Sequence, residues 1–217
     1  IIPVFNEKES LSTMVRLLKS SLNFENEVII VYDSETDNSV EEAKKLEAEL
    51  PNVKALHNSK KRGVKYAIDK GVQESVYDIF LITVVDDIFP ILAIEEMMNL
   101  ITKEDCDFIS GTRYSLGGKR IGGSLIGSIL SWTANKTFQL LTNYPFSDST
   151  TGIKMMKKNV WNSIVLESKP IGWAFAFELS IKVFIKNYKV CEVPFKSVDR
   201  LFGGKSTFKP VSWIKEY

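Results

Sequence analysis

Short apolar runs alternate with amphipathic segments along the first half of the chain. Apolar runs rich in β-branched residues are typical of strands, and apolar positions that repeat every three to four residues are typical of helices. The expected strands lie at residues 28–32, 53–56, 79–85 and 108–110, and the expected helices at 40–50, 63–75 and 91–101. This order predicts an α/β fold with an open, mostly parallel central sheet flanked by helices. Ligands of such sheets bind beyond the carboxyl ends of the strands.

The second half of the chain shows a different pattern. Residues 125–141 place apolar side chains on one helical face, but Ser128, Asn135 and Lys136 make the segment too polar to cross a bilayer. The helix could belong to the core or lie against lipid, and the sequence leaves both open. The other expected elements are strands at 152–156 and 190–195, a buried helix at 173–185 and a basic, glycine-containing loop at 199–209.

Composition narrows the class of protein. The 217 residues are 44% hydrophobic, which is enough for one sizeable core, so residues 1–217 are interpreted as a single domain. The chain opens in an apolar run without a methionine, and we expect it to be a piece of a longer protein. A net charge of +1 gives no argument for nucleic-acid binding. Cys106 and Cys191 lie in apolar runs and are expected to be buried, reduced thiols.

Acidic residues occur in two segments that follow apolar runs near the start of the chain. The first segment contains Pro3, Phe5 and Glu7, and the second contains Asp33 and Asp37. Both segments are therefore expected side by side at the carboxyl edge of the sheet. A carboxylate there can accept hydrogen bonds from a base or a ribose, and Asp33 is the candidate for that role. Asp37 is expected to cap the helix that begins nearby.

Two adjacent carboxylates, Asp86 and Asp87, follow the most apolar of the expected strands. Like charges repel each other unless a cation lies between them. Because Mg²⁺ binds one or two carboxylates together with phosphate oxygens, the pair predicts a divalent ion that carries a diphosphate. Lys60, Lys61 and Arg62 precede a helix start that could hold an anion, although a solvated basic loop fits them equally well. No G-x-G-x-x-G motif follows the first strand, which disfavours a dinucleotide-binding oxidoreductase.

Six segments spread over nearly the whole chain carry motif-like patterns. They are residues 2–7 (IPVFNE), 33–37 (DSETD), 111–114 (GTRY), 148–153 (DSTTGI), 173–178 (WAFAFE) and 192–195 (EVPF). Each pattern is weak by itself. Together and in this order they resemble glycosyltransferase family 2, especially its dolichol-phosphate mannosyltransferase-like branch.

The resemblance implies a GT-A fold, a nucleotide-diphosphate sugar as donor, Mg²⁺ or Mn²⁺ as cofactor and a polyprenyl phosphate as acceptor. It also implies a cytoplasmic location with peripheral contact to the inner face of the membrane, and the family's habit favours inversion at the anomeric carbon. Matched residue by residue, the implied nucleoside ligands are Pro3, Phe5, Glu7 and Asp33, the implied metal ligand is Asp86 or Asp87, and the implied phosphate ligands are Arg113, Arg120 and Arg200.

Three positions depart from the family pattern. Tyr32 stands where the family has the first Asp of a paired-Asp turn, and Val85 stands where its D-x-D motif begins. Where the family has a Ser-Lys pair, this chain has Ser206-Thr207, and its lysine, Lys205, comes one position earlier. These departures leave open a metal with fewer protein ligands, or a catalytically inactive relative that binds nucleotide or lipid.

The acceptor decides which residues the chemistry needs. A phosphate monoester is already anionic at neutral pH, so it needs basic residues for placement rather than a strong base. The helix at 125–141 and the loop with Arg200 and Lys205 are expected to flank such an acceptor. A hydroxyl of a glycan would instead need a carboxylate base, for which Asp148 and Glu178 are candidates. The arginines, and the lack of a Q-x-x-R-W signature, favour the lipid phosphate.

Overall fold

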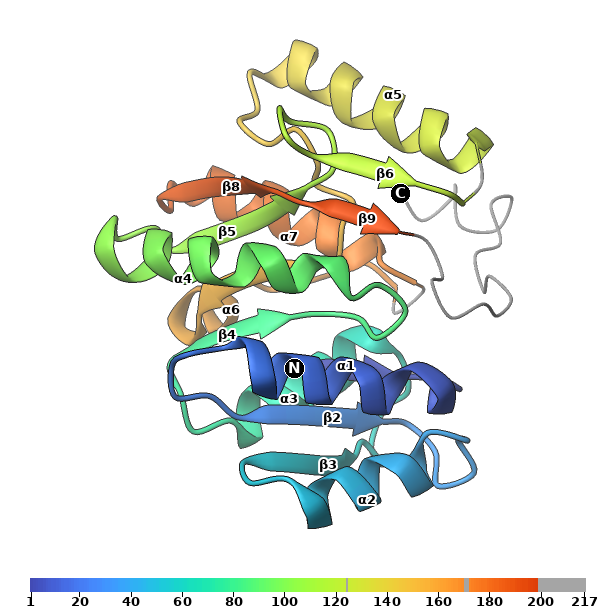
Figure 1. Cartoon of the computed structure of the whole chain (residues 1–217). Helices are drawn as coiled ribbons and strands as arrows, with labels where there is room; N and C mark the ends of the chain where they lie inside the picture. Colours follow the sequence, from blue (N-terminus) through green and yellow to red (C-terminus); the bar gives the residue numbers. More distant parts are fainter. Residues whose placement is uncertain (124, 170–171, 199–217) are drawn as a thin grey trace.

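A computed structural model of the chain describes residues 1–198 except 124, 170 and 171. It has an α/β architecture in which helices surround a central sheet (Figure 1). The strands are β1 (Ile2–Val4), β2 (Val28–Tyr32), β3 (Val53–His57), β4 (Ile79–Ile82), β5 (Phe108–Thr112), β6 (Lys119–Ile121), β7 (Lys154–Lys157), β8 (Val190–Pro194) and β9 (Lys196–Val198). The helices are α1 (Lys8–Ser21), α2 (Val40–Glu49), α3 (Val64–Glu74), η1 (Phe89–Ala93), α4 (Ile94–Lys103), α5 (Leu125–Thr142), α6 (Lys158–Ser163) and α7 (Ala174–Ile185).

The central strands form a three-stranded sheet, β3-β2-β1, and a four-stranded sheet, β4-β7-β5-β8, which lie edge to edge. Strands β1, β2 and β3 pair in parallel, β7 pairs antiparallel with β4 and β5, and β8 pairs in parallel with β5. Two backbone hydrogen bonds join β1 to β4, because the Ile1 amine donates to the Leu81 carbonyl at 2.7 Å and the Thr83 N–H donates to the Ile1 carbonyl at 3.1 Å. The carboxyl ends of all these strands except β7 therefore lie at one edge of the sheet.

The antiparallel strand β7 is the main difference from the expected sheet. The sequence predicts a parallel strand over residues 79–85, but β4 ends at Ile82 and one of its two neighbours runs antiparallel. The register places Met156 opposite both Phe80 and Phe108, so β7 fills the space between β4 and β5. Apolar runs do not encode strand direction, which here depends on how the chain returns after α5. The predicted helix at 91–101 also differs, because its first turn is the 3₁₀ segment η1.

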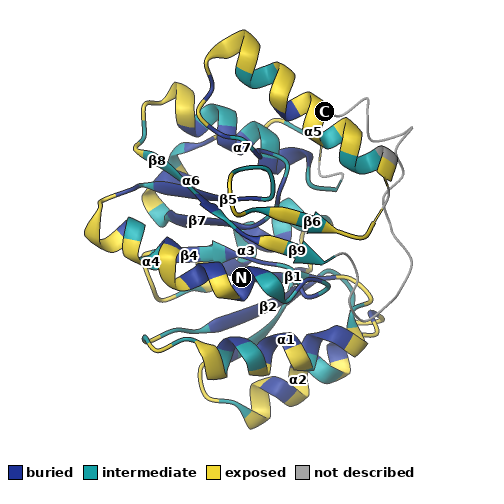
Figure 2. Ribbon diagram, turned by 45° about the horizontal axis from the view of Figure 1, so that its top comes forward, coloured by how far each residue is buried: buried dark blue, intermediate teal, exposed yellow. Residues whose placement is uncertain are grey.

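Helices cover both faces of the sheet, as the apolar strand runs predict (Figure 2). Helices α1, α2 and α4 pack on one face, and α3, α6 and α7 pack on the other. Within β2, Ile30 and Tyr32 face the first group while Ile29 and Val31 face the α3 side. A strand buried on both faces needs apolar side chains at every position, which explains the continuous runs in the sequence.

Helix α5 packs on the rest of the molecule through one side only. On that side, Phe138 lies edge-on to Tyr144 and Phe177, with ring centroids 4.9 and 5.4 Å away. The opposite side carries most of the apolar residues that the sequence groups on one face, and they are exposed rather than part of the core (Figure 2). The exposed members of that face include Leu125, Ile129, Leu130 and Leu141, and the neighbouring Trp132 and Leu140 are exposed as well. Within residues 1–198, apart from the three gaps, no helix is long and apolar enough to cross a membrane.

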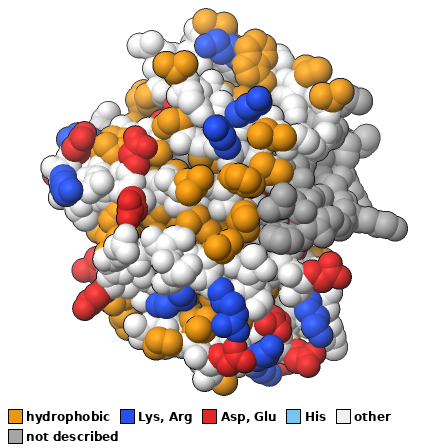
Figure 3. Space-filling model, in the orientation of Figure 1, with side chains coloured by type: hydrophobic (Ala, Val, Ile, Leu, Met, Phe, Trp, Pro, Cys, Tyr) orange, Lys and Arg blue, Asp and Glu red, His pale blue; other side chains and the backbone are white. Residues whose placement is uncertain are grey.

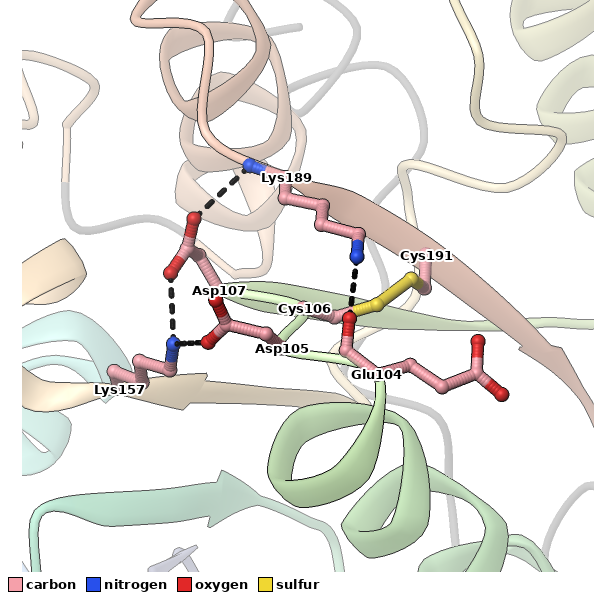
Figure 4. Close-up of a disulfide and its surroundings, with 7 residues drawn as sticks. All are labelled: Glu104, Asp105, Cys106, Asp107, Lys157, Lys189 and Cys191. Carbon is pink, nitrogen blue, oxygen red and sulfur yellow. Dashed lines mark hydrogen bonds and ion pairs between the residues drawn. A yellow bond between two sulfur atoms is a disulfide. The ribbon is translucent and has the colours of Figure 1, made fainter.

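The two cysteines form a disulfide, which corrects the expectation of reduced thiols. Cys106 precedes β5 and Cys191 lies on β8, and their Cα atoms are 6.4 Å apart because these strands are neighbours (Figure 4). Lys157 makes ion pairs with Asp105 and Asp107 beside the disulfide, at 2.7 and 3.0 Å. A separation of 85 residues hides this proximity in the sequence.

Candidate active site

Four segments that the sequence singles out meet at the carboxyl edge of the sheet. Residues 3–7 follow β1, Asp33 follows β2, the Asp86–Asp87 pair follows β4 and Arg113 follows β5. The parallel arrangement of these four strands brings their ends to the same side. The small sheet of β6 and β9 continues from β5 and β8 (Figure 1). Strand β9 also contacts η1, which follows the Asp86–Asp87 pair in the chain.

Asp37 holds the loop after β1 against the loop after β2. Its buried carboxylate accepts hydrogen bonds from the N–H of Asn6, at 3.0 Å, and of Ser39, at 2.8 Å. The Ser39 hydroxyl in turn accepts from the N–H of Glu7 at 2.8 Å. The N-cap of α2 is Ser39, which has no side-chain cap hydrogen bond, so the expected capping role of Asp37 is wrong. Asp37 instead ties the two loops together. Phe5 remains 63% exposed at this edge.

Asp33 holds the basic loop before α3. One carboxylate oxygen accepts from the Asn58 amide at 2.7 Å, and the other accepts from the N–H of Gly63 at 2.6 Å. Gly63 has φ 123°, a conformation that side-chain-bearing residues rarely adopt. Since a carboxylate can accept about four hydrogen bonds, Asp33 keeps capacity for a ligand. Its predicted contact with a nucleoside stays a prediction, and the exposed Arg62 lies in the loop that it holds.

Tyr32, which stands where the family pattern has an Asp, forms part of a stacked aromatic pair. Its buried ring stacks on His57 with centroids 5.3 Å apart, and its hydroxyl donates to Glu35 at 3.4 Å. Lys44 also pairs with Glu35 at 3.1 Å. The hydrogen bond and the charge of Lys44 hold the pKa of the Glu35 carboxylate below its ordinary value. The departure at position 32 therefore has a structural use beside the candidate nucleotide site.

The two adjacent acids after β4 differ in their surroundings. Asp87 is buried and accepts hydrogen bonds from the N–H of Phe89, at 3.1 Å, and from Ser197 and Val198 of β9. Burial raises the pKa of Asp87. Asp86 is half-buried. No group of three or more His, Cys, Asp or Glu side chains in the described part of the chain could hold a metal ion. Two neighbouring carboxylates fit an ion whose remaining ligands are phosphate oxygens.

Arg113 and Asp148 form a buried ion pair at the end of β5. The Arg113 guanidinium donates to both oxygens of Asp148, at 2.7 and 2.9 Å, and also to the Thr150 hydroxyl at 3.0 Å. Burial alone raises the pKa of Asp148, but the Arg113 charge and its hydrogen bonds outweigh burial and hold that pKa below its ordinary value. The Asp148 side chain is 0% exposed. A general base must reach the acceptor, so this arrangement does not favour the predicted use of Asp148 as a base.

Glu178, the other candidate base, holds a loop. Its carboxylate accepts from the N–H of Glu167 at 2.7 Å and of Ser168 at 2.8 Å, and it pairs with Lys182 at 2.7 Å. Burial opposes ionisation, but these contacts lower the pKa of Glu178 to about 2. A carboxylate with such a low pKa is a weak base, so the predicted role of Glu178 also gains no support.

The remaining predicted residues fall into two groups. Arg120 lies on β6, next to the segment that leads into α5, and is half-buried. Arg200 and Lys205 lie outside the described residues. Their predicted contacts with phosphate stay predictions.

Sequence reasoning missed a buried polar cluster behind Arg113. Lys154 is 0% exposed and donates to the Ser110 hydroxyl at 3.0 Å, and burial lowers the pKa of its amine to about 7. Glu192, on the neighbouring strand β8, accepts three hydrogen bonds from the turn that contains Asp148. The signal in the sequence is a lysine between apolar residues of a strand, in the segment Ile153-Lys154-Met155.

Comparison with known proteins identifies the family. A model described as Glycosyl transferase family 2 matches residues 1–164. The chain belongs to glycosyl transferase family 2. The match confirms the resemblance drawn from the six segments. The chain is therefore a glycosyltransferase of this family.

Two curated relatives of this family 2 chain are named as lipid-phosphate mannosyltransferases. Dolichol-phosphate mannosyltransferase of Pyrococcus furiosus is 29% identical over 198 residues, which are 90% of this chain and 54% of that protein. Undecaprenyl-phosphate mannosyltransferase of Micrococcus luteus is 25% identical over 209 residues, which are 94% of this chain and 84% of that protein. The family 2 chain thus spans little more than half the length of the Pyrococcus protein.

Solved structures share the fold. Glucosyl-3-phosphoglycerate synthase from Mycobacterium tuberculosis, in complex with Mn²⁺, UDP-glucose and phosphoglyceric acid, matches with a TM-score of 0.71 and 14% identity, over 98% of this chain and 72% of that one. A second structure of that enzyme, with Mg²⁺ and UDP, has the same score and coverage. The family 2 chain has the GT-A fold that the resemblance implied.

Proposed function

We propose that this family 2 glycosyltransferase moves a sugar from a nucleotide-diphosphate sugar to a polyprenyl phosphate, with residues 1–217 as one catalytic domain. The observation that carries the proposal is the pairing of an exposed apolar helix, α5, with a basic strand, β6, beside the candidate site. A lipid phosphate needs an apolar surface next to a cationic one. The names of the two curated relatives support the same class of acceptor.

The donor would bind between the loops after β1 and β2. Pro3, Phe5 and Glu7 would line the nucleoside pocket, and Asp33 would accept hydrogen bonds from the base or ribose. The diphosphate would then extend toward the ends of β4 and β5. Arg62, in the loop held by Asp33, adds positive charge on this side.

Asp86 and Asp87 would hold Mg²⁺ or Mn²⁺ together with the donor's diphosphate. When bound, such an ion stabilises the negative charge that develops on the leaving diphosphate. Structures of the mycobacterial synthase contain Mn²⁺ or Mg²⁺ together with UDP or UDP-glucose, which supports this choice of cofactor. The protein supplies few ligands of its own, so we expect metal binding to depend on the nucleotide.

The acceptor phosphate would lie on the side of β6 and α5. Arg113 and Arg120 are the proposed phosphate ligands on this side. Arg200 and Lys205, which lie outside the described residues, are proposed as further phosphate ligands. Figure 3 shows hydrophobic and basic side chains next to each other in the region of α5 and β6. The apolar face of α5 would contact the membrane at its cytoplasmic face, where the lipid phosphate lies.

The reaction requires no strong base in this arrangement. An oxygen of the ionised acceptor phosphate bonds to the anomeric carbon while the bond between that carbon and the donor's diphosphate oxygen breaks. The electron pair leaves with the nucleoside diphosphate, and attack from the opposite side inverts the anomeric centre. The engagement of Asp148 and Glu178 in other contacts fits a phosphate acceptor better than a hydroxyl acceptor.

Transfer assays with matched acceptors test this function. The protein is incubated with Mn²⁺, labelled UDP- and GDP-sugars, and vesicles that contain either undecaprenyl phosphate or undecaprenol. We expect a lipid-linked product with the phosphate only, and loss of that product in excess EDTA. Labelling of undecaprenol, or of a free oligosaccharide added in a parallel reaction, with none on the phosphate, would overturn the proposed acceptor.

The donor site has its own matched variants. Asp33→Ala is expected to weaken UDP or GDP binding at least tenfold in calorimetry. Asn58→Ala removes one partner of Asp33 but keeps the carboxylate, so it controls for loosening of the basic loop. Equal losses in the two variants would argue against direct nucleoside contact by Asp33.

A further inference from the structure

Glu192 lies on β8, next to β5, and among the described residues its hydrogen bonds all go to one turn. One carboxylate oxygen accepts from the N–H of Ser147 at 2.8 Å and of Asp148 at 3.1 Å, and the other accepts from the Ser147 hydroxyl at 2.7 Å. Glu192 is on β8, whereas the turn is 44 to 45 residues earlier in the chain. These contacts therefore fix the turn relative to the central sheet.

A chain of hydroxyl groups extends from Glu192 to the turn after β5. Because the Ser147 hydroxyl donates its proton to Glu192, it must accept from the Thr112 hydroxyl, which lies 2.6 Å away. The Thr112 oxygen in turn accepts from the N–H of Tyr114 at 3.1 Å and of Ser115 at 3.3 Å. Each hydroxyl of this chain therefore donates toward Glu192, whose carboxylate oxygens only accept in these contacts.

The second connection runs through Asp148. The N–H of Asp148 donates to Glu192, and the Asp148 carboxylate accepts from the backbone and the guanidinium of Arg113. Both connections thus end at residues 113–115, the turn that carries Arg113 at the carboxyl edge. A bidentate contact fixes the plane of a guanidinium, so the placement of Asp148 decides where Arg113 can present its remaining N–H groups.

Buried charges around this turn are costly for the fold. Glu192 interacts electrostatically with Lys154 of β7, with Asp148 and with the Tyr144 phenol, and burial raises the pKa of Glu192. The hydroxyls of Tyr114 and Ser115, in the turn itself, are buried and find no hydrogen-bond partner among the described residues. Apolar residues of similar volume often stabilise a core as well as buried ions do, so stability alone gives little reason for this cluster.

We propose that Glu192 is a positioning residue of the transfer site, which fixes the turn at residues 113–115 and thereby the guanidinium of Arg113. The inference rests on the proposed function, in which Arg113 contacts a substrate phosphate. Glu192 itself touches no substrate. Its effect on transfer passes through Ser147, Thr112 and Asp148.

Two readouts test the proposal, in Glu192→Gln and in a matched control. Glu27→Gln replaces another largely buried glutamate, which accepts the N–H of Val76 at 2.6 Å and pairs with Lys54 far from the carboxyl edge. Hydrogen exchange of peptides covering residues 108–116 and 144–151 is measured first. Exchange of the 114 and 115 amides is expected to accelerate at least tenfold in Glu192→Gln and to stay within twofold of wild type in Glu27→Gln.

Transfer kinetics give the second readout. A displaced Arg113 raises KM for the phosphate substrate, whereas partial unfolding lowers kcat at constant KM. We expect KM to rise at least tenfold in Glu192→Gln and in Thr112→Val, and to recover in Thr112→Ser, which keeps the hydroxyl. In an Arg113→Ala background, Glu192→Gln should add no further loss, because both changes act on one group.

The outcomes separate this inference from the function on which it rests. Unchanged exchange at residues 114 and 115 in Glu192→Gln would overturn the positioning role, whatever the acceptor is. Altered exchange with wild-type KM, or a full additional loss in the Arg113→Ala background, would overturn the link to Arg113. If wild type transferred sugar to no phosphate, the proposed function would fail, and the exchange data would still decide whether Glu192 holds the turn.

Discussion

Aspartates at the carboxyl edge of the sheet have different roles, although each occurs in a similar polar segment of the sequence. Asp37 and Asp148 are buried and bind backbone or guanidinium donors of the protein. Asp33 is half-buried and keeps acceptor capacity on the ligand side. The difference follows from the number of N–H groups that the fold brings to each oxygen. Such numbers are set by loops that meet in space.

Lys154 supplies a prediction about pH at this scale. Burial lowers its pKa from the ordinary value of 10.5 to about 7, so the unfolded chain binds one more proton than the folded chain between these pH values. Stability contributed by this group therefore rises with pH from about 7 to 9.5, by at most about 1.4 kcal/mol per pH unit. Lys154→Met should lack that rise. Urea denaturation at pH 7, 8 and 9.5 measures both slopes, and parallel slopes in the two proteins would contradict the prediction.

Among the elements, α5 is unusual because it exposes many apolar side chains, whereas an ordinary helix packed on a core buries them. Besides the aromatic contacts of Phe138, its inner side makes polar contacts, in which the buried Asn135 accepts from the N–H of Ser149 at 2.9 Å and Ser131 bonds to Thr150 at 2.9 Å. Its outer side exposes apolar residues such as Leu140, which is 78% exposed. Exposed apolar area of this extent is typical of a surface that binds another protein, a ligand or a membrane.

The double variant Ile129→Lys/Leu140→Lys tests lipid contact by α5. Each apolar side chain inserted in lipid contributes roughly 1–2 kcal/mol, so the variant is expected to bind vesicles more than tenfold more weakly. Both positions are exposed, so the melting temperature should change little. Val165→Lys alters an exposed apolar residue outside α5 and serves as control. Flotation with anionic vesicles measures the difference, and equal flotation of all three proteins would exclude this role.

At the scale of the whole molecule, one continuous sheet carries two halves of the site. Strands β1 and β2 place the loops for the proposed nucleoside contacts, and β5 with β8 places Arg113 and Glu192. The disulfide between Cys106 and Cys191 joins the β5–β8 half at the opposite edge from the site. It closes a loop of 85 residues and restricts the unfolded chain.

Removal of the disulfide should therefore lower stability without changing the site. A bond of this kind contributes about 2–4 kcal/mol, which corresponds to a melting temperature lower by roughly 5–10 °C in Cys191→Ser or in reductant. Scanning fluorimetry with and without dithiothreitol measures the shift, and thiol titration of the unfolded protein verifies the redox state. An identical melting temperature in all conditions would show that the link contributes nothing.

The sequence by itself determined the family, the α/β class and the positions of most strands and helices. These features depend on local patterns, because a strand buried on both faces must be apolar at every position, as β2 is. Six short motifs in the correct order were sufficient for the family. The sequence also placed Asp33, Asp86 and Asp87 at one edge of the sheet, because parallel strands bring residues at their carboxyl ends together.

The tertiary structure decided what depends on residues far apart in the chain. The direction of β7, the pairing of Cys106 with Cys191 and the outward orientation of the apolar face of α5 each require contacts that no local pattern records. The same is true of Glu192, whose partners lie 44 to 45 residues away. Hydrophobic periodicity indicates which side chains are better removed from water, but the packing of distant segments determines which residues they contact.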